Sequence, residues 1–220
     1  EHRQLSLAFI GARDLDRRLE RDGADATVAR LQQLAVEIER AQAEYDLLWV
    51  GADALPGAAD FVLVAGSPTA HEDDEDRLLT ACREILDAGI DLTIAITEGI
   101  PAHDMMQVYT HLKRGNQQLL GPNCPGAISP GKATVGIMPT DVFTPGRVGI
   151  ISRSGTLTYQ ISKEIGDMGI GQSTVVGIGG DPIVGSSFID ILQKFEDDQE
   201  TDLIVMVGEI GGDEEEKAGA

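Results

Sequence analysis

Hydrophobic runs of strand length alternate with segments of helical periodicity along almost the whole chain. The runs predict strands over residues 5–10, 47–50, 61–65, 92–97, 118–120, 148–152, 174–178 and 203–207. Regular alternation of strands and helices is typical of α/β proteins with parallel sheets. The sequence therefore predicts an α/β fold built on parallel sheets.

Two helices are predicted by the spacing of their hydrophobic residues. The first has apolar side chains three or four positions apart, which places them on one face: Val28, Leu31, Leu34 and Ile38. The second, over residues 76–88, carries a similar set: Leu78, Leu79, Cys82, Ile85 and Leu86. Gly89 follows as a C-terminal stop. We expect both faces to pack on a sheet and Cys82 to be a core residue.

Both periodicities stop between residues 121 and 146, where five of the nine prolines lie. Such a segment is typical of an ordered connector between domains. We expect a first domain over residues 1–122, a connector over 123–146 and a second domain over 147–220. Only three strands are predicted after residue 147, so we expect the second domain to be incomplete.

The charge of the chain excludes two classes of partner. It carries 37 acidic and 17 basic side chains, a formal charge of −20 over 220 residues. Nucleic acids and anionic membranes both attract basic surfaces, so neither is an expected partner. With 42% hydrophobic residues, however, the chain has enough apolar surface to fold.

The cysteines and the apolar runs indicate the compartment. Cys82 and Cys124 are the two cysteines, and their spacing suits neither a redox pair nor a zinc site. No apolar run reaches the length of a membrane span. We expect a cytoplasmic protein without a metal site of its own.

The turn after residues 148–152 is a candidate anion site. There a predicted strand runs through Arg153, Ser154 and Gly155 into a helix that begins near Leu157. Free backbone N–H groups and the positive end of the helix dipole bind phosphate at such a turn. An ordinary turn, in which Ser154 only caps the helix, explains the same residues equally well.

Other strand ends carry residues suited to ligand binding. The segment 177–182 is rich in glycine, which lets a ligand approach the backbone, and Glu209 lies among glycines after the last predicted strand. Thr97 and Glu98 follow another strand, where a helix cap and turn is an equally good explanation. Cys124 lies in a rigid Pro/Gly segment, but as a nucleophile it would require a neighbouring His or Lys.

Five segments together resemble one enzyme family. They are ITEGIP at 96–101, GPNCPG at 121–126, VGIISRSGTLTYQ at 148–160, GQSTVVGIGGDPIVGSSFIDIL at 171–192 and IVMVGEIGG at 204–212. In this order they resemble the α subunit of succinate–CoA ligase (succinyl-CoA synthetase), from about residue 61 to residue 212. ATP-citrate lyase is similar around SRSG, GIGGD and GEIGG, but GPNCPG and the TLTY run favour succinate–CoA ligase.

The resemblance implies a fold, a reaction and a partner. It implies a Rossmann-like CoA-binding domain followed by a flavodoxin-like ligase domain. It also implies a β subunit that holds ATP or GTP with Mg²⁺. The implied reaction interconverts succinate, CoA and a nucleoside triphosphate with succinyl-CoA, nucleoside diphosphate and phosphate, through succinyl phosphate and a phosphohistidine.

The resemblance also assigns roles to individual residues. Six are assigned to coenzyme A: Ile96, Thr97, Glu98, Asn123, Cys124 and Pro125. Ser154 and Gly155 match the phosphate-binding helix terminus, and Tyr159 matches a residue of the succinate site. Glu209 matches the glutamate that orients the catalytic histidine. No residue is assigned to a metal.

Two departures from the family concern the ends of the sequence. The family's catalytic histidine lies in a Gly-His-Ala-Gly-Ala segment beyond GEIGG, and this sequence ends at Ala220 without it. We therefore expect a C-terminally truncated chain that does not complete the reaction alone. At the N-terminus the family has a Gly-rich loop and a lysine that serve CoA, whereas the first lysine here is Lys113.

The divergent N-terminal region leaves a second hypothesis open. The first strand leads into a loop with one glycine, Gly11, and the basic candidates to replace the missing contacts are Arg13, Arg17 and Arg18. Guanidinium groups bind phosphate well, but acidic residues lie beside these. The alternative to an enzyme subunit is a non-catalytic CoA-binding module or assembly scaffold derived from the same family.

Overall fold

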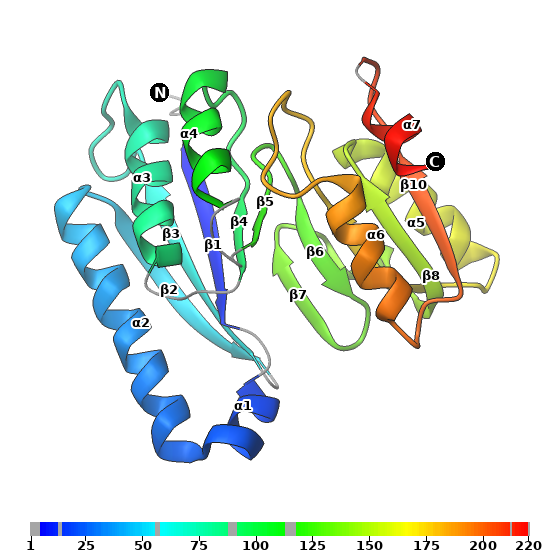
Figure 1. The fold of residues 1–220 in the computed structure, drawn as a ribbon, viewed down its shortest axis with the longest axis horizontal. Coiled ribbons are helices and arrows are strands. Elements are labelled where there is room, and N and C mark those ends of the chain that lie inside the picture. Colours follow the sequence, from blue (N-terminus) through cyan, green and yellow to red (C-terminus); the bar gives the residue numbers. More distant parts are fainter. Residues whose placement is uncertain are drawn as a thin grey trace.

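The computed structural model describes residues 5–12, 15–55, 58–87, 92–112, 118–211 and 213–219. The chain forms two five-stranded sheets that stand side by side, with helices packed on them (Figure 1). The α/β class predicted from the sequence is confirmed. Each of the eight predicted strands has a counterpart in the structure; the bounds agree for 118–120 and 203–207 and differ for the other six.

The first sheet has the strand order β2-β3-β1-β4-β5. Its strands are β1 (Ser6–Ala12), β2 (Leu48–Leu55), β3 (Ala58–Ala65), β4 (Leu92–Ala95) and β5 (Gln118–Leu120). Strand β1 pairs antiparallel with both β3 and β4, and β2 pairs antiparallel with β3. Only β4 and β5 are parallel among these pairs.

The expectation of a parallel sheet is thus wrong for the first three strands. The physical reason is the connection between β2 and β3, where only residues 56 and 57 separate Leu55 from Ala58. A parallel connection requires a crossover of a dozen residues or more, so this pair is restricted to a hairpin. The small residues of segment 51–60 lack the pattern of a strand, so the hairpin was not predicted, although the Pro-Gly dipeptide at 56 and 57 is typical of a turn.

The second sheet has the order β10-β8-β9-β6-β7. Its strands are β6 (Gly126–Ser129), β7 (Ala133–Gly136), β8 (Pro145–Ser152), β9 (Gln172–Gly177) and β10 (Leu203–Val207). The pairs β10–β8 and β8–β9 are parallel, as expected. The hairpin β6–β7 and the 3₁₀ helix η1 (Thr140–Val142) come from the Pro/Gly-rich segment 123–146, and β6 pairs antiparallel with β9.

Helices cover the sheets in the manner that their hydrophobic faces require. The first half of the chain has α1 (Leu15–Asp22), α2 (Ala24–Glu44), α3 (Asp74–Asp87) and α4 (Ala102–Leu112). The second has α5 (Gly155–Asp167), α6 (Phe188–Asp197) and α7 (Glu214–Ala218). Helices α5 and α6 pack on opposite faces of the second sheet. Neighbouring residues of a strand point to opposite faces; on β8, Ile150 belongs to the cluster that includes residues of α5, and Ile151 to the cluster that includes residues of α6.

The two helices predicted from periodicity are confirmed as parts of α2 and α3. On α2, Leu34 and Ile38 are buried, but Val28 is 51% exposed, because the neighbouring Thr27 takes the buried position at the start of the helix. Cys82 on α3 is a core residue, as expected. The expected stop at Gly89 lies outside the described residues.

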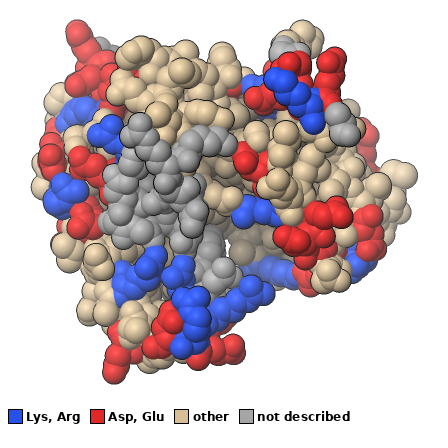
Figure 2. Space-filling view, in the orientation of Figure 1, with Lys and Arg blue, Asp and Glu red and all other residues tan. Residues whose placement is uncertain are grey.

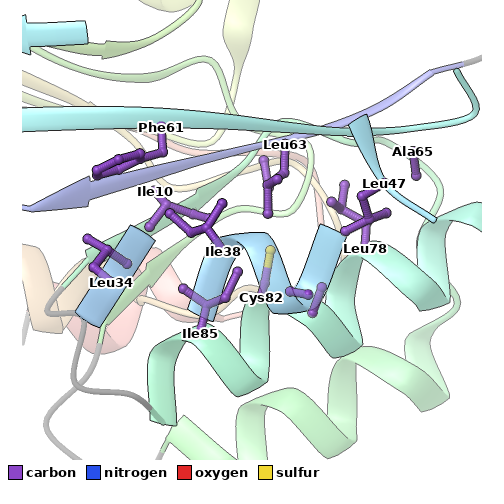
Figure 3. Packing of buried hydrophobic residues seen from close by; sticks show 13 residues of the cluster. Ile10, Leu34, Ile38, Leu47, Phe61, Leu63, Ala65, Leu78, Cys82 and Ile85 are labelled. Carbon is purple, nitrogen blue, oxygen red and sulfur yellow. The ribbon is translucent and has the colours of Figure 1, made fainter. Parts of the chain in front are cut away.

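The first core cluster lies between the first sheet and helices α2 and α3 (Figure 3). Ile10 and Leu63, from neighbouring strands β1 and β3, point toward Ile38 of α2 and Cys82 of α3. Ile10, Leu63 and Ile38 are completely buried. This cluster holds the divergent N-terminal region on the sheet that also contains β4.

A second core cluster joins the two sheets. Ile94 of β4 and Leu120 of β5 belong to the same buried cluster as Ile151 of β8, Ile178 and Phe188. Apolar burial contributes roughly 25 cal/mol per Å², so a continuous cluster of this kind opposes separation of the sheets. The carboxyl ends of β4 and β8 are thereby held close to each other.

Truncation of Leu63 tests the first cluster. We expect Leu63→Ala to lower the free energy of unfolding by about 2–5 kcal/mol, because it leaves a cavity at a fully buried position. Urea denaturation followed by circular dichroism measures this change. The matched control, Val36→Ala on the exposed face of α2, should change it by less than about 0.5 kcal/mol. Equal effects of the two substitutions would contradict the described packing.

Candidate functional site

The candidate segments meet at one edge of the molecule, where the strands β4, β5, β8, β9 and β10 end. Hydrogen bonds between backbone groups connect them: Gly121 N donates to Ile178 O at 3.2 Å, and Asn123 N donates to Thr97 O at 2.7 Å. Arg153 N donates to Val207 O at 2.9 Å. Ligands of open α/β sheets bind at the carboxyl ends of strands, so this edge is the candidate site.

The segment that resembles a CoA contact follows β4. The Thr97 hydroxyl is buried against the first strand, where it accepts a hydrogen bond from Leu7 N at 3.0 Å. Ile96 is half-buried, whereas Glu98 and Gly99 are exposed at the edge. Thr97 therefore anchors the segment, and the exposed polar surface offered to a ligand comes from residues 98 and 99.

The segment Gly121–Pro125 crosses between the two sheets. A Cβ on Gly121 would lie 2.2 Å from Ala95 O, and Gly121 has φ of 90°, so the crossing accepts no side chain at this position. Asn123 also has a positive φ, 54°, and is half-buried. Its side-chain Nδ2 donates to Asp181 Oδ1 at 3.0 Å. Pro125 is buried beneath the crossing.

Cys124 lies in the interior and not at the surface of the edge. It is 3% exposed, and its Sγ donates a hydrogen bond to Ala95 O at 3.3 Å. Burial raises the pKa of the Cys124 thiol to about 12. A thiol that is protonated at neutral pH is a poor nucleophile, so Cys124 acts as a packing residue.

The turn after β8 is compatible with both interpretations that the sequence left open, a helix cap and an anion site. Ser154 is the N-cap of α5, and its Oγ accepts a hydrogen bond from Leu157 N at 3.4 Å. The first turn of α5 contains no acidic residue. The first amides of a helix have no partner within the helix, so Gly155 and Thr156 present theirs at the edge. The cap is confirmed, and the geometry is compatible with an anion.

Arg153 fixes the neighbouring glycine-rich loop. Its guanidinium is 8% exposed and donates to Gly179 O at 3.3 Å and to Asp181 O at 2.6 Å. On its other side Nη1 lies 3.8 Å from the Glu214 carboxylate. The buried guanidinium of Arg153 therefore connects the loop after β9 with the start of α7. Its hydrogen bonds are made to backbone carbonyl groups.

Glu209 lies at the end of β10 and is exposed. Its backbone N–H donates to the Glu215 carboxylate at 3.0 Å, which holds α7 against the loop. A Cβ on Gly208 would lie 2.4 Å from the same carboxylate oxygen, so a side chain at this position would displace the Glu215 carboxylate. The Glu209 side chain itself is available at the edge.

Tyr159 lies one turn into α5 and is half-buried. Its ring packs edge-on against Phe143, with 6.2 Å between the ring centroids. Burial, followed by the neighbouring Cys124, raises the pKa of the Tyr159 hydroxyl. At neutral pH the hydroxyl is therefore protonated and is a hydrogen-bond donor.

The basic residues of the first loop lie at the opposite edge. Leu7 is hydrogen-bonded to Thr97 at the candidate edge. From Leu7, β1 extends to Ala12 at its other end, a distance of about 17 Å at the usual rise per residue. Helix α1, which carries Arg17 and Arg18, begins at that far end (Figure 1). Basic side chains gather at the lower edge of Figure 2, below the candidate site. Arg13 lies outside the described residues.

The described ranges contain no group of three or more His, Cys, Asp or Glu side chains that could hold a metal ion. No helix within those ranges is both long and apolar enough to cross a bilayer. Two cavities, of about 240 and 270 Å³, lie between α3 and α4 and beside α6, away from the candidate edge.

Comparison with known proteins identifies the second part of the chain. Residues 151–220 match the family model for CoA-ligase. A succinate–CoA ligase [ADP-forming] subunit alpha 2 of Archaeoglobus fulgidus is 58% identical over 138 residues, which are 63% of this chain and 48% of that protein. The matched part of the chain is homologous to the α subunits of succinate–CoA ligases. The chain spans about half the length of the curated relatives it matches.

A related subunit has another acid in its name. The malate–CoA ligase subunit alpha of Methylorubrum extorquens is 54% identical over 144 residues, 64% of this chain and 49% of that protein. Its similarity is close to that of the succinate–CoA ligase subunit of Aquifex aeolicus, 55% over 137 residues, 61% of this chain and 45% of that protein. Overall similarity therefore does not separate the two acids.

Solved structures show the same fold at lower identity. The ATP citrate lyase of Methanothrix soehngenii, in complex with citrate and coenzyme A, aligns with a TM-score of 0.59 at 24% identity. That alignment covers 63% of this chain and 24% of the lyase chain. A dinucleotide-forming acetyl-coenzyme A synthetase of Ca. Korarchaeum cryptofilum aligns with a TM-score of 0.55 at 20% identity, over 84% of this chain and 43% of that one.

Sequence reasoning assigned no role to three residues that organise the edge. Arg153, Asp181 and Glu214 form a connected set around the loop after β9. Arg153 and Asp181 stood inside quoted motifs, but a side chain that bonds to backbone carbonyls leaves no sign in residue spacing.

Thiol labelling tests the burial of both cysteines. Burial raises the pKa of Cys82 and of Cys124 to about 12 each. We expect the native protein to react negligibly with dithionitrobenzoate at neutral pH on the time scale in which the urea-unfolded chain releases two equivalents. Rapid release of one equivalent by the native protein would contradict the description of Cys124 as a packing residue.

Proposed function

We propose that this chain supplies the CoA-binding and phosphate-binding segments of a succinate–CoA ligase α subunit. The complete enzyme would interconvert succinate, CoA and a nucleoside triphosphate with succinyl-CoA, nucleoside diphosphate and phosphate. The observation that carries the proposal is the convergence of the motif segments 96–101, 121–126, 153–155 and 178–182 at one edge. The homology of the matched part supports it independently.

The phosphate site in this proposal is the N-terminus of α5. Gly155 stands at the first helical position, and a Cβ there would have nothing within 4 Å, so an anion can approach closely. The helix dipole and the first-turn amides favour negative charge at this end. We assign Tyr159, one turn further along, as the donor to the carboxylate of the acid.

The CoA site in this proposal lies along residues 96–99. Ile96 offers an apolar contact, and the exposed Glu98 and Gly99 offer polar groups to the nucleotide end of CoA. Helix α1 cannot serve the CoA phosphates here, because it stands at the other end of β1. In this proposal the CoA phosphates are therefore bound by backbone groups of the candidate edge and not by α1.

The remaining parts of the proposal concern the nucleotide and the catalytic histidine. The β subunit would hold ATP or GTP with Mg²⁺, and Glu209, exposed at the end of β10, would orient the catalytic histidine. Relatives named for succinate and for malate are nearly equally similar, so the substrate class is a four-carbon dicarboxylate, with succinate as our choice.

A non-catalytic CoA-binding module remains the second candidate function. The specific observation behind it is a departure from the family pattern: the antiparallel β1 removes the first loop from the candidate edge. The two candidates differ in phosphate binding, because a CoA-binding module has no use for a free helix terminus at α5.

Phosphate binding by two variants of Gly155 tests the enzyme proposal. Gly155→Pro removes one amide donor but suits the first helical position, and Ser154 already has the extended backbone, φ −95° and ψ 120°, that precedes proline. Gly155→Ala keeps the amide and has room for its Cβ. We expect the proline variant to weaken orthophosphate binding about tenfold and the alanine variant to leave it unchanged, measured by phosphorus NMR titration.

Calorimetric titration of the full chain with CoA completes this test. Saturable CoA binding together with the phosphate result supports the ligase proposal. CoA binding without any phosphate binding would favour the non-catalytic module. A folded chain that binds neither compound would overturn both candidates.

A further inference from the structure

Asn123 occupies the point where the two ligand segments touch. Its N–H donates to Thr97 O at 2.7 Å, and its carbonyl accepts from Gly180 N at 3.1 Å. Its side-chain Nδ2 donates to the Asp181 carboxylate at 3.0 Å. One residue thus bonds to the segment after β4 on one side and to the loop after β9 on the other.

The loop after β9 is held by backbone contacts with the crossing and by two side chains, Arg153 and Asn123. Gly179 has φ of 103°, and a Cβ there would lie 2.1 Å from Pro122 O, so the loop packs against the crossing by backbone alone. Arg153 holds the carbonyls of Gly179 and Asp181. The hydrogen bond between Asn123 and Asp181 is the side-chain contact that fixes the loop relative to Thr97.

The hydrogen bond is well suited to this task. A hydrogen bond to a carboxylate is stronger than one to a neutral carbonyl group. Asparagine also tolerates the positive φ of position 123, which most residues do not. The amide of Asn123 is engaged within the protein, so its effect on a ligand is indirect.

We infer that Asn123 is a positioning residue that couples the CoA segment to the loop beside the phosphate site. This inference rests on the proposed function. When one ligand orders the contact around Asn123, it meets the entropy cost of that ordering. The second ligand then binds without this cost, so each ligand tightens the binding of the other. Thermodynamic linkage requires the effect to be reciprocal and equal in both directions.

Exchange of the two side chains tests the inference. Asn123→Asp opposes two carboxylates at the contact and breaks it, whereas the double variant Asn123→Asp/Asp181→Asn restores donor and acceptor in reverse order. Arg153 bonds to the backbone of residue 181, so the double variant keeps that contact. The matched control, Gln33→Glu, adds the same charge on the exposed face of α2.

The first readout is CoA affinity with and without saturating orthophosphate. We expect phosphate to tighten CoA binding about fivefold in the wild type, the Gln33→Glu control and the double variant, and to have no effect in Asn123→Asp. Persistence of the phosphate effect in Asn123→Asp would overturn the inference, and so would its absence from the double variant.

The second readout does not depend on ligands. Hydrogen exchange of the Gly180 and Asn123 amides should be faster in Asn123→Asp than in the wild type and should return to the wild-type rate in the double variant. If the wild type binds no CoA, the proposed function fails, and this exchange pattern alone decides whether Asn123 fixes the loop. Unchanged exchange in Asn123→Asp contradicts the inference whatever the chain binds.

A second variant covers the case in which Asn123→Asp does not fold. Asp181→Ala removes the acceptor without placing a new charge at the contact. We expect it to abolish the phosphate effect on CoA affinity and to accelerate exchange at Gly180. Wild-type behaviour of Asp181→Ala in both readouts would overturn the inference.

Discussion

The close backbone crossing at Gly121 and Pro122 is the constraint on which the candidate edge depends. A Cβ on Gly121 would lie 2.2 Å from Ala95 O, and one on Gly179 would lie 2.1 Å from Pro122 O. The crossing therefore packs closely against the end of β4 on one side and against the loop after β9 on the other. The buried cluster that includes Ile94 and Ile151 joins the two sheets next to this crossing.

The sequence predicted the fold class well because strand-length runs and helix periodicity are local signals. Leu34 and Ile38 fell on a buried face of α2 as their spacing required. Strand direction in the first sheet was not predictable in the same way, because it depends on the short connection after Leu55 and on pairing between β1 and β4. The pairing of β1 with β4 joins residues far apart in sequence, and no local pattern encodes it.

In the candidate site, too, local features were predictable from the sequence and long-range contacts were not. Ser154 as a helix cap and the glycines at strand ends were predictable, since caps and glycine positions follow from local backbone geometry. The engagement of Thr97 with Leu7 and of Asn123 with Asp181 was not, because each joins segments more than fifty residues apart. The structure consequently changes two candidate ligand contacts into groups that hold the ligand segments in place.

The central claim is that ligands bind at the edge where β4, β8 and β9 end, and the amide spectrum of the chain with CoA and orthophosphate tests it most directly. Two-dimensional NMR of the labelled chain records each backbone N–H separately. The account predicts shifts at Gly99, Gly155 and Gly179, with α1 unaffected. Shifts confined to Arg17 and Arg18, at the opposite edge, would contradict it.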